Sequence, residues 1–251
     1  MTKFWVLHKK TIINGLLVTG IVLCLIIANL LSKFIIPSDL SSSSVSSSSY
    51  ELHLISLSKS KVENESKERA RDFQALGAGG FIWKQDDYFY VISSAYLNKN
   101  DAALVQNSIK LNHNLESQIL TIKFSPYTIY GNFDSEQTKV LDKLLSACFD
   151  IYTSVYDVVI SLDTGVSNET SARLAINAAQ NNLAKAVANF NTLFPAPVPD
   201  NLSPLKDMID RVFTVGQKLS ASEAINDSQT YSSIIKYRYL EILNIFYQFT
   251  N

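Results

Sequence analysis

Residues 81–95 read FIWKQDDYFYVISSA, and this stretch decides the fold of the first half of the chain. Two runs rich in aromatic and β-branched residues, 81–84 and 88–95, flank the polar triplet Gln85-Asp86-Asp87. Such runs, separated by a short polar turn, predict a β-hairpin. The glycine cluster at 77–80 stops the segment before the hairpin and fits no phosphate-binding fingerprint.

Outward from the hairpin, the sequence predicts two more strands and two helices. Strands are predicted at 50–57, where apolar and polar residues alternate, and at 119–124. Helices are predicted at 61–76, a polar and helix-prone run, and at 98–111. Asn98 or Asn100 can cap the second helix. The order strand, helix, hairpin, helix, strand predicts a four-stranded antiparallel sheet with both helices on one face. This is a ferredoxin-like βαββαβ domain over residues 50–125.

These residues resemble the SPOR (sporulation-related repeat) domain family of bacterial cell-envelope proteins. Residues 50–57 (YELHLISL) stand for the family's first strand, and residues 88–96 (YFYVISSAY) stand for the second strand of its hairpin. Asp101-Ala102-Ala103 stands where the family's second helix begins. The chain departs from the family's usual Gln, Gly and Pro residues at His53, Ile55, Ser94 and Ala95. The resemblance covers residues 50–125 only. It implies binding of peptidoglycan glycan strands, stripped of their stem peptides, at sites of division or sporulation.

Alternation along the strands indicates which side chains would meet such a ligand. Phe89, Val91 and Ser93 are expected to face the helices. The opposite, uncovered face would carry Glu51, His53, Ile55, Tyr88, Tyr90, Ile92 and Ser94. Aromatic rings pack on sugar rings, and polar groups bind hydroxyls, so this face suits a glycan. Cross-strand packing of Tyr88 and Tyr90 is the simpler alternative, as is a half-exposed structural role for His53.

A membrane anchor is predicted at the N-terminus. Residues 11–31 read TIINGLLVTGIVLCLIIANLL, which is uncharged and long enough to cross a bilayer at about 1.5 Å per residue. The flanking lysines are Lys3, Lys9 and Lys10 before the run and Lys33 after it. This bias keeps residues 1–10 in the cytoplasm and places the rest outside. A cleaved signal peptide is the alternative, but its apolar core would be shorter and end in a small-x-small site.

Residues 32–49 contain two runs of four serines and predict a flexible linker.

Other features of the sequence exclude several classes of function. The net charge is −1, with no basic stripe to attract nucleic acid. Cys24 and Cys148 are too few for a disulfide framework or a metal cage. No motif pairs a nucleophile with a base or spaces metal ligands, so neither an enzyme, a metal nor a cofactor is expected.

From residue 135 the hydrophobic pattern changes to a helical period. Apolar stripes predict helices at 141–162, 168–194, 203–219 and 222–249. They should form an antiparallel bundle over residues 135–251, which makes the whole chain α+β. The last helix is apolar around most of its circumference and should be central or packed on two sides. Lys236, Arg238 and Glu241 argue against its being a second membrane span.

The sequence therefore predicts a single-pass bacterial envelope protein whose extracytoplasmic part binds peptidoglycan. The bundle would serve self-association or docking of a protein partner. Two alternatives remain open. One is a membrane-tethered scaffold that binds proteins through its sheet or bundle, without glycan. The other is an unrecognised wall hydrolase.

Overall fold

The computed structural model describes residues 43–46, 49–164, 166 and 168–251. The predicted cytoplasmic tail, membrane helix and most of the linker therefore lie outside the described residues. Residues 44–130 and 135–251 form one compact unit, which is the one considered below, and the rest of the chain is assigned to a second. In the described part of the chain, six α-helices and two antiparallel sheets make a mixed α/β structure.

The larger sheet has four antiparallel strands in the order β3-β4-β2-β5. Its elements are β2 (Tyr50–Ser60), α2 (Glu63–Ala75), β3 (Phe81–Gln85), β4 (Tyr88–Tyr96), α3 (Lys99–His113) and β5 (Gln118–Phe124). The predicted element order is confirmed. Asn98 caps α3, since its side chain accepts a hydrogen bond from the Asn100 amide at 2.8 Å.

Two local features fix the hairpin as the sequence indicated. Asp86, in the β3–β4 turn, has φ 53°, a left-handed conformation that aspartate tolerates. Gly79 precedes β3 where the chain passes close to its neighbours. A Cβ at Gly79 would lie 2.8 Å from the Ser93 carbonyl oxygen and 2.9 Å from a Leu240 methyl carbon. Glycine therefore permits the C-terminal helix to approach the sheet.

The remaining long helices are α4 (Ser135–Asp163), α5 (Glu169–Leu193), α6 (Ser203–Ser220) and α7 (Tyr231–Thr250), with a 3₁₀ turn η1 (Asp200–Leu202) before α6. The fourth helix was predicted to begin at 222, but it begins at Tyr231. Ser222 has φ 51°, which ends α6, and Thr230 caps α7 by accepting a hydrogen bond from the Ser233 amide.

Two further points concern helix α4 and a small sheet. By length and composition α4 could cross a membrane, but nine of its side chains are buried, as expected of a helix in a protein core. Strands β1 (Ser43–Ser46) and β6 (Thr128–Gly131) pair in a two-stranded sheet that the sequence pattern did not predict, and β1 falls within residues 32–49, which were expected to be a flexible linker. Four-residue strands are too short to show a clear period, and β1 is mostly serine.

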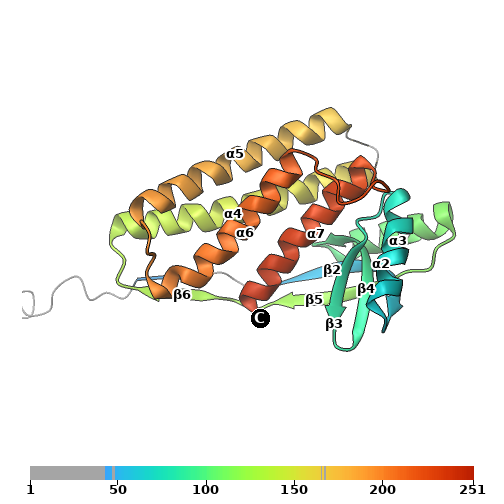
Figure 1. Ribbon diagram of the computed structural model, residues 1–251, viewed down its shortest axis with the longest axis horizontal. Helices are drawn as coiled ribbons and strands as arrows, with labels where there is room; N and C mark the ends of the chain where they lie inside the picture. The colour runs from blue at the N-terminus through green and yellow to red at the C-terminus, as the bar shows by residue number, and fades with distance from the viewer. Residues whose placement is uncertain (1–42, 47–48, 165, 167) are drawn as a thin grey trace, which may run out of the picture. The chain divides into compact units, whose positions relative to one another are not determined.

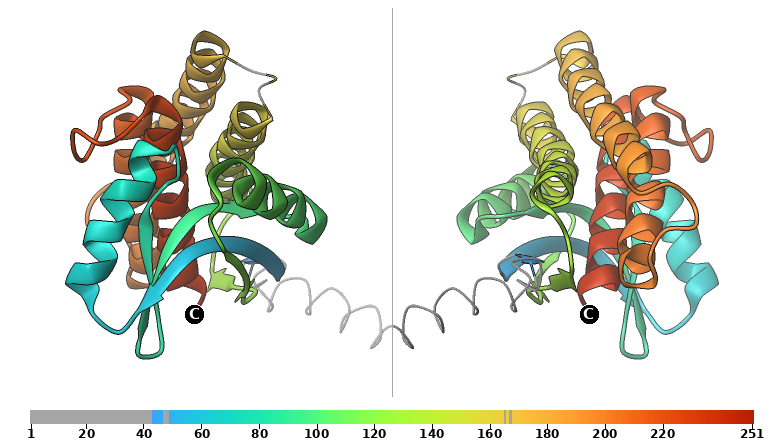
Figure 2. Two further views of the ribbon diagram at one scale, coloured as in Figure 1. Left: turned by 90° about the vertical axis from the view of Figure 1, so that its right-hand side faces the viewer. Right: turned by 90° about the vertical axis from the view of Figure 1, so that its left-hand side faces the viewer.

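The four-stranded sheet is packed between helices on both faces. On one face, Ile55 and Tyr96 form a buried cluster with Ala102 of α3, and Ser66 of α2 contacts the Phe89 carbonyl oxygen. On the other, α7 runs along β3 and β4 (Figure 1). Figure 2 shows α2 and α7 passing on either side of the β3–β4 hairpin. The sheet and the helical bundle thus share one hydrophobic core.

This shared core predicts a single cooperative unfolding transition. The chain has two tryptophans, Trp5 and Trp83, so a Trp5→Phe variant reports the α7-facing sheet through Trp83 fluorescence alone. Far-UV circular dichroism reports mainly the helices. The two probes should give coincident urea midpoints for the full-length chain. A sheet signal that is lost at a clearly lower urea concentration than the helical signal would contradict a common core.

Candidate functional site

Three of the six predicted ligand-binding residues are buried. Two of them, Tyr90 and Ile92, lie on the sheet face that α7 covers, whereas Ser94 pairs with Ile55 on the α3 face. Ile92 and Ser94 are fully buried and Tyr90 is 8% exposed. Tyr90 pairs with Trp83 and Ile92 pairs with Phe81 across β3 and β4, so all four side chains share a face. The expectation that this face is uncovered is wrong, because the chain's own C-terminal helix lies on it.

The ring contacts show how α7 covers the face. The Trp83 ring lies 5.1 Å from that of Tyr247, and the Phe81 ring lies 5.4 Å from that of Tyr237. Tyr247 also contacts Phe124 of β5, at 5.7 Å between centroids. Many α7 side chains are themselves fully buried, namely Ile235, Tyr239, Leu240, Ile242 and Leu243. Helix α7 is therefore a fixed layer of the core and not a lid over the sheet.

The other three predicted residues remain accessible but lie apart. Glu51 and His53 are spaced at every second residue from Ile55 along β2 and therefore lie on the sheet face that carries α3. Glu51 pairs with Lys123 at 3.1 Å, and His53 Nδ1 is 3.2 Å from Thr121 Oγ1. Tyr88 is half-buried near the hairpin turn, where the Lys59 ammonium lies 3.7 Å from its ring centroid. These residues form a polar strip and a separate aromatic corner, and do not make one site.

A more promising site lies at the open edge of β3, which is an edge strand of the sheet. We call this hollow of about 630 Å³ the edge groove. It is lined by residues of α2, β3, β4, the α6–α7 connection and α7: Glu63, Lys67, Ala70, Arg71, Gln74, Gly80, Phe81, Ile82, Lys84, Phe89, Ile225, Asn226 and Tyr237. Its volume lies within the range of ligand-binding clefts.

The floor of the edge groove is apolar and aromatic, with its amides already bonded. Phe81, Phe89 and Tyr237 supply rings, and burial raises the pKa of the Tyr237 hydroxyl, which is therefore neutral. Gln74 donates to the Gly79 carbonyl oxygen at 3.1 Å and accepts from the Asn226 amide at 2.9 Å. These bonds hold the α6–α7 connection against α2, so the groove is preformed.

The rim carries more cations than anions. Lys67 pairs with Glu63 at 2.7 Å, and this hydrogen bond and charge, together with the charge of Lys84, hold the pKa of Glu63 below its ordinary value. Arg71 and Lys84 are exposed, and neither forms an ion pair with any residue that the structure describes. The edge groove thus offers two cations without an ion-pair partner among the described residues, beside aromatic rings, and this arrangement suits a sugar bearing a carboxylate.

Sequence reasoning missed this groove because its parts come from distant segments. Lys67 and Arg71 stand at i and i+4 on α2, which places both on one helix face. Lys84 follows on β3, and Tyr237 comes from a helix more than 150 residues later. The cation spacing was visible in the sequence, but the aromatic partner across the groove was not.

Comparison with known proteins adds one similarity. No protein-family model matches this sequence, and no curated protein matches it significantly. Among solved structures, the chain is similar to the solution structure of the peptidoglycan binding domain of the B. subtilis cell wall lytic enzyme CwlC. The identity is 20%, the match covers 30% of this chain and 95% of that one, and the TM-score is 0.27. Similarity at this level identifies neither fold nor ligand for this chain.

Proposed function

We propose that this chain is a membrane-anchored, extracytoplasmic protein that binds the glycan strands of bacterial peptidoglycan through the edge groove. The observation that carries the proposal is the placement of Arg71 and Lys84, without carboxylate partners among the described residues, beside the rings of Phe81 and Tyr237. The element order and the central position of β2 and β4 support a split β-α-β module of the SPOR type.

The chemistry of the ligand explains why cations would matter. In peptidoglycan, the stem peptide is joined by an amide bond to a lactyl group on every second sugar. An amidase that removes the peptide leaves a free carboxylate there, so a stripped strand carries a regular series of negative charges. Arg71 and Lys84 can bind such carboxylates through charge-assisted hydrogen bonds, and the rings can pack on the apolar faces of the sugars.

Anchoring and cellular role complete the proposal. Residues 11–31 hold the protein in the cell membrane, residues 1–10 stay in the cytoplasm, and the part of the serine-rich linker before β1 gives the folded unit some reach. The protein acts as a binder and not as an enzyme, and serves division or sporulation, when stripped glycan is formed. The helical bundle would add self-association or docking of a protein partner.

The edge groove predicts a charge-dependent wall interaction. Full-length protein in detergent should co-sediment with sacculi, and more strongly after amidase treatment. The double variant Arg71→Glu, Lys84→Glu should lose roughly tenfold in affinity, because two exposed ion pairs contribute about 1–2 kcal/mol together. The measurement is the bound fraction as a function of the amount of wall.

Lys185→Glu is the control for a charge reversal elsewhere on the surface. It reverses one exposed charge on α5, away from the groove, and should bind as the unaltered protein does. Equal binding by the double variant and this control would refute the edge groove as the site. No sedimentation of the unaltered protein with either kind of wall would refute glycan binding altogether.

A protein scaffold is the second candidate, and one observation favours it. Helix α7 occupies the sheet face that would otherwise be open to a ligand. If neither kind of sacculus is bound, cross-linking of the full-length protein in its membrane should instead yield a defined protein partner.

A further inference from the structure

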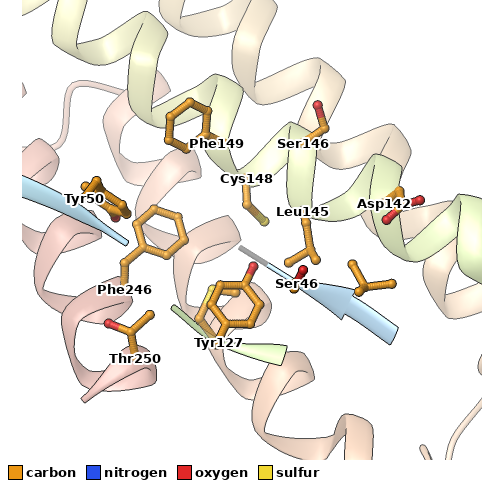
Figure 3. A pocket seen from close by; sticks show the side chains of 12 residues that line it. Ser46, Tyr50, Tyr127, Asp142, Leu145, Ser146, Cys148, Phe149, Phe246 and Thr250 are labelled. Carbon is orange, nitrogen blue, oxygen red and sulfur yellow. The ribbon is translucent and has the colours of Figure 1, made fainter. Parts of the chain in front are cut away.

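A second cavity lies away from the edge groove, where α4, α6 and α7 meet the two-stranded sheet. It has a volume of about 390 Å³ and we call it the bundle cavity. It is lined by Val45, Ser46, Tyr50, Tyr127, Asp142, Leu145, Ser146, Cys148, Phe149, Met208, Phe246 and Thr250. Figure 3 shows Leu145, Cys148 and Phe246 directed inward from α4 and α7.

The interior of the bundle cavity is apolar and uncharged. Val45, Cys148 and Met208 are buried in its wall, and the rings of Tyr50 and Tyr127 complete it. Burial raises the pKa of the Cys148 thiol and of the Tyr127 hydroxyl to about 12, so both are neutral at physiological pH. The interior therefore favours a hydrocarbon group over any charged one.

The border of the cavity is more polar than its interior, and this polarity limits which headgroup a bound molecule can place there. Asp142 is exposed at the border and is the one charged side chain among the lining residues. Ser46 and Ser146 are also exposed there, while Phe149 is 49% exposed and extends the apolar wall toward solvent. An apolar chain inside with a polar, non-anionic head outside fits this distribution. Asp142 would repel the carboxylate of a free fatty acid.

We propose that the bundle cavity binds one acyl chain of a membrane lipid with a neutral, zwitterionic or cationic headgroup. If residues 11–31 span the membrane, lipid molecules lie near the cavity. The inference therefore rests on the anchor in the proposed function. Val45 follows Leu31 by 14 residues, which limits its distance from the bilayer surface to about 50 Å at full extension. Lipid is thus the most abundant apolar ligand within reach.

Lipid photolabelling tests the inference directly. Full-length protein is placed in nanodiscs that contain phosphatidylethanolamine with a diazirine at the end of one acyl chain. After irradiation, mass spectrometry should find adducts in two places, the anchor at 11–31 and the cavity wall on α4 and α7. Free fatty acid with the same diazirine, added to the nanodiscs, should label the wall much less.

Leu145→Trp fills the cavity from its wall and should reduce the adducts on α4 and α7 at least about fivefold, with anchor labelling unchanged. Leu174→Trp, at a 67% exposed position on α5, is the matched control and should label as the unaltered protein does. Circular dichroism confirms that both variants are folded. Anchor labelling without wall labelling, or wall labelling that Leu145→Trp leaves intact, would overturn the inference. Absence of anchor labelling would refute the anchor separately, and sedimentation with sacculi reports glycan binding independently of both.

Discussion

Replacing Lys236 with methionine should lower the free energy of unfolding by about 3–5 kcal/mol. Lys236 of α7 pairs with Asp163 at the end of α4, and their side chains are only 9% and 11% exposed. Lys236 also donates to the Gly77 carbonyl oxygen at 3.1 Å, and the Tyr96 hydroxyl donates to Asp163 at 2.8 Å. Methionine keeps the apolar stem but leaves the Asp163 carboxylate buried without its counter-charge, which is the costly state.

Urea unfolding of the full-length chain measures this effect. Lys185→Met, at an exposed position on α5, removes the same charge and should change stability by less than about 0.5 kcal/mol. Adding Asp163→Asn to Lys236→Met should restore part of the loss, because the uncompensated charge is then gone. A single Lys236→Met variant as stable as the control would mean that water or rearrangement solvates the carboxylate.

Replacing Trp83 with alanine should also lower the free energy of unfolding by about 3–5 kcal/mol, but for a different reason. Trp83 is 3% exposed and its ring fills the space between β3 and α7, against Tyr247 and Phe81. Removing it leaves a cavity in the contact between sheet and bundle. Because α7 is also the most buried helix of the bundle, the loss should be shared by the whole unit.

Thermal unfolding followed by circular dichroism at 222 nm separates this result from a local one. The helical signal should be lost at a clearly lower temperature in Trp83→Ala, although the changed residue lies on a strand. Leu104→Ala, at a 70% exposed position on α3, is the control and should leave the midpoint nearly unchanged. If the helices of Trp83→Ala melt as in the control, then the bundle is stable without the sheet.

Local features of the chain were predictable because they depend on neighbouring residues. The hairpin at 81–95, the cap at Asn98 and the strand at 118–124 all follow from period, turn chemistry and capping within a few positions. The all-round apolar character of α7 even indicated packing on two sides, although not which element would supply the second contact.

What could not be predicted depends on contacts between distant segments. Packing of α7 on the sheet joins Tyr247 to Trp83 across more than 160 residues, and no local period encodes that choice. The register irregularities around Ser56 in β2 also break the simple alternation of side chains. Alternation counted from Tyr88 would place Ser94 on the same face as Ile92, but Ser94 lies on the other face. The edge groove has the same origin, since Arg71 and Tyr237 meet only after α7 docks.

The position of β2 in the middle of the sheet has a mechanical consequence. In the proposed role the protein would join a membrane to a wall and would carry tension, and a pull from the proposed anchor would enter the four-stranded sheet at Tyr50, after β1. The 11-residue strand β2 is bonded to β4 on one side and β5 on the other. Because hydrogen bonds between antiparallel strands run perpendicular to the strands, a pull along β2 loads both ladders in shear and at once. Under the same pull, an edge strand is held by a single ladder, so the central place of β2 doubles the number of ladders that resist extraction.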